Sequence, residues 1–254
     1  MFERAHHRRV AAVLESLDAK LLLQNRCLFG GGTAIALTHG EFRESVDIDL
    51  ICSSVDGYRE LRSLVNRGGI NILFRTPVAI LRPPRIDQYG IRCALAVDGV
   101  PIKLEIVFEG RLALADPGPG DKIAGVWALT LEDKVATKLM ANSDRWLDAA
   151  MMSRDLIDLA MLTPTGQLPR AGVDKAIRAY GDGVVADLNK AREHLLGSAG
   201  RLKTCISKMG INLAEPELRK RIERLQVEES NGPKTGTRMR KTRASYSIYL
   251  TLKQ

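Results

Sequence analysis

Two aspartates one residue apart, Asp47 and Asp49, interrupt an otherwise apolar run, SVDIDLI. On an extended strand side chains alternate between faces, so both carboxylates project from one face while Val46, Ile48 and Leu50 pack on the other. Two carboxylates this close repel each other unless a cation lies between them. Mg²⁺ prefers such hard oxygen ligands and binds through one or two carboxylates together with substrate phosphates. The spacing therefore predicts a magnesium site for a phosphorylated substrate.

A glycine triplet, Gly30 to Gly32, precedes the two aspartates and joins an apolar run to a short apolar helix pattern. Glycines at a strand-to-helix turn let backbone N–H groups approach a phosphate, and the helix N-terminus adds a favourable partial charge. A glycine run alone is commonly a turn, and an Asp-x-Asp alone is commonly a solvated edge strand. Their order along the chain makes each support the other and predicts a phosphate loop beside a metal site.

A third carboxylate, Glu105, interrupts the apolar run PIKLEIV and shares one strand face with Lys103. The dipeptide Asp98-Gly99 predicts a tight hairpin between this strand and the one before it. Beside the Asp47/Asp49 strand, Glu105 would bind a second ion or accept a proton from the attacking hydroxyl. The alternative is an exposed Lys/Glu face with no catalytic role.

Apolar periodicity predicts an α/β (α+β) chain with strands in its first half and helices in its second. We expect helices over 2–24, 56–66, 149–162 and 214–226, one from Thr130, two within 172–197, and strands over 70–75, 88–97 and 100–108. His6 and His7 are expected at a solvated helix end. The loop Asp116–Asp121, rich in proline and glycine, marks a border. The expected parts are a core over 1–120, a helical lobe over 121–228 and a basic, flexible tail over 229–254.

Two stretches resemble a known family. The strings GGTAIAL and SVDIDL resemble the first motif of the AbiEii-type nucleotidyltransferases, a branch of the DNA polymerase beta superfamily often found as toxins of bacterial toxin–antitoxin pairs. LEDKVATKLMANSDR and SRDLIDLAML resemble the family's later motifs, and the similarity covers residues 28–162. The resemblance implies a polymerase-beta-like nucleotidyltransferase core, with the nucleotide held against the helical C-terminal lobe.

The resemblance also implies roles for individual residues. Asp47, Asp49 and Glu105 would be the catalytic, metal-binding acids, with two Mg²⁺ ions. The nucleotide would be bound by the loop and lobe residues Gly31, Gly32, Thr33, Ser45, Lys138, Arg145 and Asp155. Asp158, one turn further on, is a weaker candidate. Without the resemblance, Asp155 would be assigned to the solvent-facing side of its helix, because acids three apart on a helix commonly lie there. A longer link between Arg145 and Arg154 than in the family leaves the choice between Lys134 and Lys138 open.

Composition and charge restrict the kinds of protein that this chain could be. No apolar run approaches the ~20 residues that span a bilayer, and the N-terminus lacks a signal-peptide pattern, so we expect a cytoplasmic protein. The four cysteines lie far apart without a Cys-x-x-Cys pair, which argues against a zinc site and against a disulfide framework. The net charge of +8 arises wholly after residue 200, where Lys and Arg outnumber Glu.

These features predict transfer of a nucleoside monophosphate from an NTP to a hydroxyl acceptor. The acceptor implied is RNA, with tRNA the first choice, and the family implies a cognate antitoxin. The basic cluster Arg238, Arg240, Lys241 and Arg243 would attract phosphate backbones, or form a solvated tail. Two alternatives are transfer to a small hydroxylated molecule and a non-catalytic NTP- or RNA-binding module.

Overall fold

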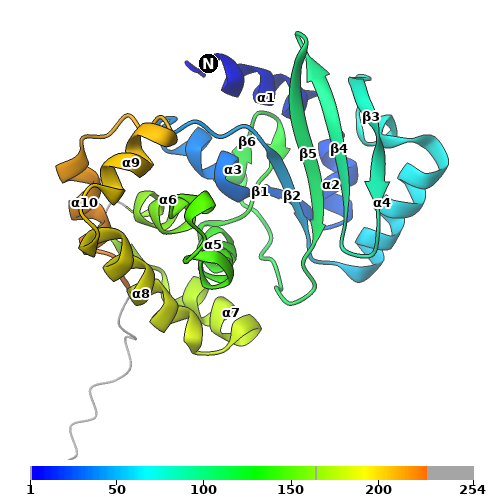
Figure 1. Cartoon of the computed structure of the whole chain (residues 1–254). Helices are drawn as coiled ribbons and strands as arrows, with labels where there is room; N and C mark the ends of the chain where they lie inside the picture. Colours follow the sequence, from blue (N-terminus) through cyan, green and yellow to red (C-terminus); the bar gives the residue numbers. More distant parts are fainter. Residues whose placement is uncertain (1, 164, 228–254) are drawn as a thin grey trace, which may run out of the picture.

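A five-stranded mixed sheet forms the centre of the first half of the chain. The computed structural model describes residues 2–163 and 165–227, so the predicted tail lies outside the described residues. The strand order is β1-β2-β5-β4-β3 (Figure 1). The strands are, in that order, β1 (Cys27–Gly30), β2 (Ile48–Cys52), β5 (Val100–Phe108), β4 (Gly90–Val97) and β3 (Ala79–Ile86).

Strand direction brings two predicted acids together. β2 and β5 are parallel, whereas the other neighbouring strands are antiparallel. In the parallel pair Asp49 lies directly opposite Glu105. The hairpin between β4 and β5 turns at Asp98 and Gly99, which both have positive φ, as predicted from the dipeptide. The predicted α/β class is confirmed.

Four helices belong to the sheet half: α1 (Ala5–Ser16), α2 (Ala19–Gln24), α3 (Gly31–Thr38) and α4 (Val55–Gly68). Apolar side chains of α1 and α4, such as Leu14 and Leu61, join a buried cluster with Leu50, Ile91 and Leu104 of the sheet. These strand residues alternate with polar ones, as expected for a sheet with one covered face. The other face is left for the polar residues of β2, β5 and β4.

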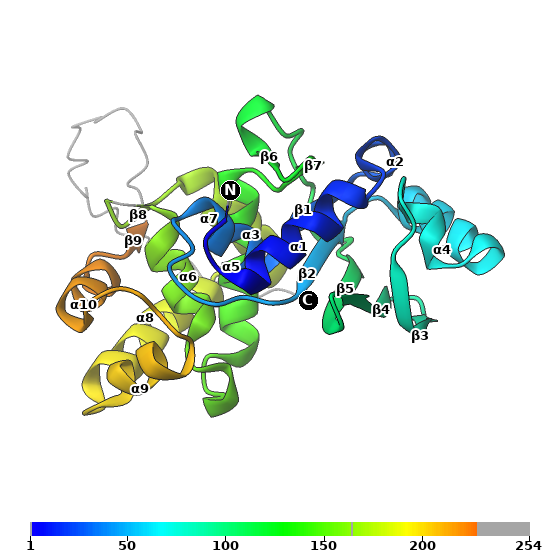
Figure 2. The same cartoon turned by 90° about the horizontal axis from the view of Figure 1, so that it is seen from above.

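The second half of the chain is a helical lobe beside the β1 end of the sheet (Figures 1 and 2). Its helices are α5 (Leu131–Arg145), α6 (Arg154–Leu162), α7 (Arg170–Tyr180), α8 (Gly183–Gly197), α9 (Arg201–Lys208) and α10 (Glu215–Glu223). Their core also takes Ile35 of α3 and Phe42 from the sheet half. The two halves therefore share core residues. The domain borders expected after residues 120 and 228 stay a prediction.

Short elements complete the fold. β6 (Lys122–Ile123) pairs with β7 (Val126–Trp127), and β8 (Gln167–Leu168) pairs in parallel with β9 (Gln226–Val227). Short 3-10 helices span Ile70–Leu73, Pro119–Asp121 and Ala149–Met151. Within the described residues no helix combines the length and the apolar character needed to cross a membrane.

Several element predictions were wrong in detail. The strand expected over 70–75 is a 3-10 helix, and β3 was missed because Pro83 and Pro84 interrupt its pattern. Proline is tolerated there because β3 is an edge strand. The first predicted helix is two, since the Asp18 side chain accepts hydrogen bonds from Lys20 and Leu21 N–H groups and starts α2.

Other differences lie at element ends. The helix expected over 149–162 is a 3-10 turn followed by α6, with Met152 and Ser153 left-handed between them. The last predicted helix ends at Glu223, and Gln226, which was expected in it, belongs to β9. Val46, expected to pack beneath the sheet, precedes β2 and is 40% exposed.

Candidate active site

A cavity of about 350 Å³ lies between the open sheet face and helix α5. Its walls come from α3, the segment before β2, β2 itself, β5 and α5. Nine of the ten predicted site residues line it: Gly31, Gly32, Thr33, Ser45, Asp47, Asp49, Glu105, Lys138 and Arg145. The tenth, Asp155, does not line the cavity but contacts Lys138 and Arg145, which do. Further lining residues that the sequence analysis did not assign to the site include Arg43, Lys103, Thr137 and Arg154.

The glycine loop is fixed by its backbone. Gly31, the first residue of α3, has φ +69°, a left-handed conformation that glycine adopts without strain. A Cβ atom at this position would lie 2.2 Å from Oδ2 of Asp49. The loop therefore needs glycine both for its conformation and for its contact with the carboxylate, and it brings the first turn of α3 against the cavity.

Hydroxyl groups tie this loop to the acidic strand. Thr33 Oγ1 donates to the backbone oxygen of Asp47 at 2.5 Å and lies 2.8 Å from Ser45 Oγ. Since the Thr33 proton is used on Asp47, the Ser45 hydroxyl donates to Thr33. Thr33 and Ser45 thus position the segment that carries Asp47, in addition to facing the cavity.

His7 supports the same segment from α1. Its side chain is fully buried, so the prediction of a solvated helix end was wrong for this residue. Its Nε2 accepts from the Ser45 N–H at 3.2 Å, and its Nδ1 lies 2.7 Å from Glu41 Oε1. This pattern requires the tautomer with the proton on Nδ1. Burial lowers the pKa of His7, which favours the neutral ring.

Asp47 and Asp49 have the properties of a cation site. Burial, and then the charge of Asp47, raises the pKa of Asp49. A cation at this position would relieve that repulsion, so the donor set fits a hard divalent ion. Within residues 2–163 and 165–227, no three His, Cys, Asp or Glu side chains are already arranged to hold a metal.

Glu105 is held by basic neighbours. Its Oε1 accepts from Arg92 Nε at 2.7 Å, and its Oε2 lies 2.6 Å from Lys103 Nζ. Arg92 in turn donates to Asp87 at 2.9 Å. Although burial alone would raise it, Lys103 and Arg92 hold the pKa of Glu105 below its usual value. A carboxylate of low pKa is a weak proton acceptor. The environment of Glu105 therefore favours binding of a cation over its predicted role as base.

The opposite wall of the cavity carries a buried charge network. Lys138 Nζ lies 2.9 Å from Asp155 Oδ1 and 2.6 Å from Asp158 Oδ2. Arg145 Nε donates to Asp155 Oδ2 at 2.7 Å. Although burial would raise it, these cations, led by Lys138, hold the pKa of Asp155 well below its usual range. Asp155 therefore orients Lys138 and Arg145, the arrangement that the family resemblance implied.

Asp158 does not lie on the solvent-exposed side of its helix. It is completely buried and accepts two hydrogen bonds from Arg43, at 2.7 and 2.9 Å. The Arg43 side chain also meets the glycine loop, since a Cβ added to Gly32 would lie 2.0 Å from its terminal nitrogen. Arg43 lies 115 residues from Asp158 in the sequence, and no local pattern signals the pair.

The structure separates the two candidate lysines. Lys138 lines the cavity, whereas Lys134 does not. Lys134 is buried one turn earlier on α5, and this burial lowers its pKa. Of the two, Lys138 is thus the lysine that can contact a ligand in the cavity.

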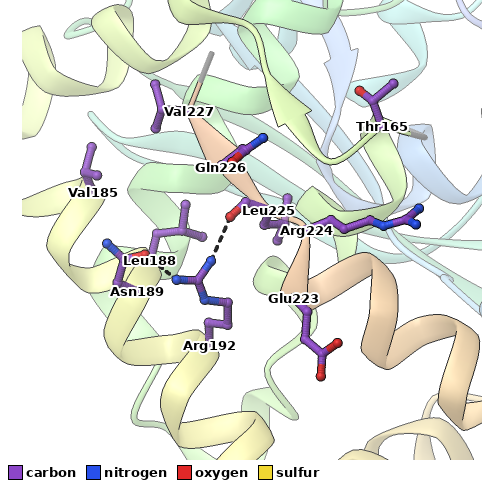
Figure 3. A pocket seen from close by; sticks show the side chains of 10 residues that line it. All are labelled: Thr165, Val185, Leu188, Asn189, Arg192, Glu223, Arg224, Leu225, Gln226 and Val227. Atoms are coloured by element: carbon purple, nitrogen blue, oxygen red, sulfur yellow. Dashed lines mark hydrogen bonds between the residues drawn. The ribbon is translucent and has the colours of Figure 1, made fainter. Parts of the chain in front are cut away.

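A second cavity, of about 610 Å³, lies within the helical lobe and holds none of the predicted site residues (Figure 3). α8 and the segment from Glu223 to Val227 form most of its wall. Arg192 crosses it and donates to the Leu225 backbone oxygen at 2.8 Å and to Asn189 at 3.1 Å. Arg192 and Asn189 are thus bonded within the fold.

Similar folds are known. A candidate nucleotidyltransferase from H. pylori is 16% identical, with a TM-score of 0.50 over 88% of this chain and 95% of that one. JHP933 from Helicobacter pylori is 15% identical, with a TM-score of 0.51 over 88% and 92%. MenT4, a nucleotidyltransferase toxin from Mycobacterium tuberculosis, is 18% identical, with a TM-score of 0.39 over 87% and 85%. No curated protein matches the chain.

The mixed sheet, its glycine loop and the paired aspartates are those of a nucleotidyltransferase. The family described as the nucleotidyl transferase AbiEii toxin of a type IV toxin–antitoxin system matches residues 13–232. The chain belongs to this AbiEii toxin family, and the resemblance seen in the sequence is confirmed.

Proposed function

We propose that the protein transfers a nucleoside monophosphate from an NTP to a hydroxyl group of RNA, with Mg²⁺ as cofactor. One observation carries the proposal: Asp47 and Asp49 share a single cavity with the glycine loop, Lys138 and Arg145. This places carboxylates for a metal and donors for a triphosphate around one space.

The residues divide the work between them. Gly31, Gly32 and Thr33 would bind the triphosphate through the first turn of α3, while Lys138 and Arg145 offset its charge. Asp47 and Asp49 would hold Mg²⁺, which when bound stabilises charge on the transferred phosphoryl group. The acceptor hydroxyl gives its proton to water, its oxygen forms a bond to the α-phosphorus, the bond from that phosphorus to the β-phosphate oxygen breaks, and pyrophosphate leaves. Catalysis of this kind consists mainly of positioning and electrostatic stabilisation.

RNA is the preferred acceptor, and tRNA the first class to test. The excess of 13 Lys and Arg over 5 Glu after residue 200 suits a polyanion. A small hydroxylated molecule is the second candidate acceptor. A binding module without activity is disfavoured because both aspartates, the glycine loop and Lys138 are present together.

The test is direct. The purified protein is incubated with Mg²⁺, each NTP labelled at its α-phosphate in turn, and total bacterial RNA, and label is sought in RNA on a denaturing gel. Label that depends on Asp47, absent with Asp47→Asn, supports the proposal and identifies the nucleotide. Pyrophosphate release that requires small hydroxyl compounds, with RNA unlabelled, moves the acceptor to a small molecule. NTP binding without release in either assay overturns the reaction.

We also propose a cognate antitoxin, because the family is described as the toxin of a two-component system. The gene next to this one is its first candidate. Expression of the chain alone should arrest growth, and co-expression of that neighbour should restore it, whereas Asp47→Asn should be harmless alone. Harmless wild-type expression would contradict the toxin role without bearing on the chemistry.

A further inference from the structure

A single row of charged residues crosses the open face of the sheet. Asp49 of β2 lies opposite Glu105 of β5, Glu105 opposite Arg92 of β4, and Arg92 opposite Arg85 of β3. Residues opposite each other in neighbouring strands share a face. The row therefore changes from acidic at the cavity to basic at the sheet edge.

A second row runs beside the first. Lys103 of β5 lies opposite Ala94 of β4, and Ala94 lies opposite Arg82 of β3. Arg82 and Arg85 are three residues apart, yet both face this side because the register shifts on either side of Arg82. The shift includes Pro83-Pro84, the dipeptide that hid this strand from the sequence analysis.

The face between these rows is open and shallow. Ala94 and Ala96 are small and half-buried, while Ile91 and Leu95 point to the covered face and are fully buried. Within residues 2–163 and 165–227, no helix of the lobe continues over this part of the sheet, which extends away from the lobe in Figure 1. We call the surface formed by Arg82, Arg85, Arg92, Ala94 and Lys103 the basic shelf.

The location of the shelf follows the geometry of the reaction. The triphosphate groups proposed above, namely the glycine loop, Lys138 and Arg145, lie on the lobe side of Asp49. In phosphoryl transfer the attacking and leaving oxygens are roughly in line, so the acceptor arrives opposite the departing pyrophosphate. From Asp49 that direction leads over β5 and β4 to β3. Strands about 4.8 Å apart place Arg85 roughly 15 Å from Asp49.

Two charges on the shelf, those of Arg82 and Arg85, are available to a ligand, whereas Arg92 and Lys103 pair with Glu105. Arg85 is 82% exposed, and its contact with Asp87 is long, at 3.9 Å. Such an exposed pair holds its partners weakly. Among the described residues no ion pair involves Arg82, which is also exposed. Phosphates bound by exposed Lys and Arg release counterions, which favours a polyanion over a single small ligand.

We propose that the basic shelf binds the phosphate backbone of the acceptor RNA next to its reacting hydroxyl. The inference rests on the proposed function and adds the surface through which the acceptor is held. It assigns Arg82 and Arg85 to acceptor binding, apart from the nucleotide site.

The test uses the full chain with Arg82→Ser and Arg85→Ser combined. The matched control is Arg59→Ser with Arg67→Ser, which removes two exposed charges from α4 on the covered side of the sheet. Binding of end-labelled bulk tRNA is measured at several salt concentrations. The shelf variant should bind at least tenfold more weakly, with a salt slope shallower by about 1.4, as expected for two lost single-strand phosphate contacts.

Four further measurements complete the test. NTP binding should be unchanged in both variants, and Arg82→Lys with Arg85→Lys should restore RNA affinity, which shows that charge rather than folding is at issue. If wild type labels RNA and the shelf variant binds it like the control, the shelf is overturned while the proposed function stands. If wild type neither binds nor labels RNA, both the proposal of RNA as the acceptor and the proposal of the basic shelf are overturned. Loss of antitoxin binding with RNA binding intact would assign the surface to a protein partner and overturn the inference.

Discussion

Arg43 and Asp158 form a two-fold hydrogen-bonded ion pair inside the protein, with both side chains almost entirely buried. Arg43 belongs to the segment between the glycine loop and the acidic strand, whereas Asp158 belongs to α6 of the helical lobe. The pair fixes the distance between the two walls of the cavity. Each charge depends on the other, because a buried charge without a partner is strongly disfavoured.

Removing one partner of this pair should destabilise the protein. We expect Arg43→Leu to lower the free energy of unfolding by about 3–5 kcal/mol, because Asp158 would keep only Lys138. Urea denaturation followed by circular dichroism measures the change. Arg59→Leu, which breaks an exposed pair with Asp56, is the control and should cost less than about 1 kcal/mol. Equal effects in the two variants would contradict a structural role for the buried pair.

Asp49→Asn should separate stability from activity. Because burial and Asp47 raise the pKa of Asp49, its charged form is unfavourable in the folded chain, and that cost grows as pH rises through the raised pKa. Without Mg²⁺, the amide variant should melt at or above the wild-type temperature at neutral pH. Its turnover should nevertheless fall by orders of magnitude. Added Mg²⁺ should raise the melting temperature of wild type alone. A variant that melts lower and responds to Mg²⁺ would speak against a cation site here.

Gly31→Ala should lower turnover because its added Cβ collides with Asp49, although no catalytic group is removed. The new Cβ would meet Asp49 and shift it, and a displacement of about 1 Å in an active site costs roughly 10²-fold in rate. Gly99→Ala is the matched control, since Gly99 has a similar positive φ, +74°, but nothing within 4 Å of an added Cβ. Both variants should lose at least about 1 kcal/mol of stability because of the positive φ, and Gly31→Ala more because of its collision with Asp49, while only Gly31→Ala loses turnover. Equal activity in the two would show that the loop tolerates a side chain.

His7 should make stability depend on pH. Its pKa is lowered from 6.5 by burial, so below that value the unfolded chain binds a proton that the folded chain resists. Stability is therefore full above pH 6.5 and falls as pH drops through the folded-state pKa. His7→Gln should reduce this dependence, measured as the urea midpoint against pH. Glu41, Arg4 and His6 surround the ring, and Glu41→Gln controls for the acid. An unchanged profile in His7→Gln would place the dependence elsewhere.

The sequence predicted those features of the site that depend on residues close together in the chain. Asp47 and Asp49, two positions apart, line one cavity although Asp47 precedes β2, and the Asp98-Gly99 turn places β5 beside β4. The proximity of Glu105 to the aspartates was also expected, although the parallel direction of β5 relative to β2 was not specified. These features persist because short-range geometry decides them.

What the sequence could not show depends on contacts between distant segments. His7 reaches Ser45 across 38 residues and Arg43 reaches Asp158 across 115, so neither has a local signature. Arg92 was missed as a partner of Glu105 because a hairpin pairing must be in register before the contact exists. His7 looked solvated because two adjacent histidines at a helix start are usually exposed, and only tertiary packing buries one of them.

The segment between the glycine loop and the aspartates is held by His7 of α1 and also by residues that come much later in the chain. Besides Asp158, Met209 and Asn212 bind it, through hydrogen bonds from Glu44 N to the Met209 oxygen at 3.1 Å and from Asn212 N to the Phe42 oxygen at 2.9 Å. A chain emerging from the ribosome thus carries its aspartates long before it has the partners that shape the loop in front of them. Translation must therefore pass residue 212 before these contacts can shape the segment that carries Asp47.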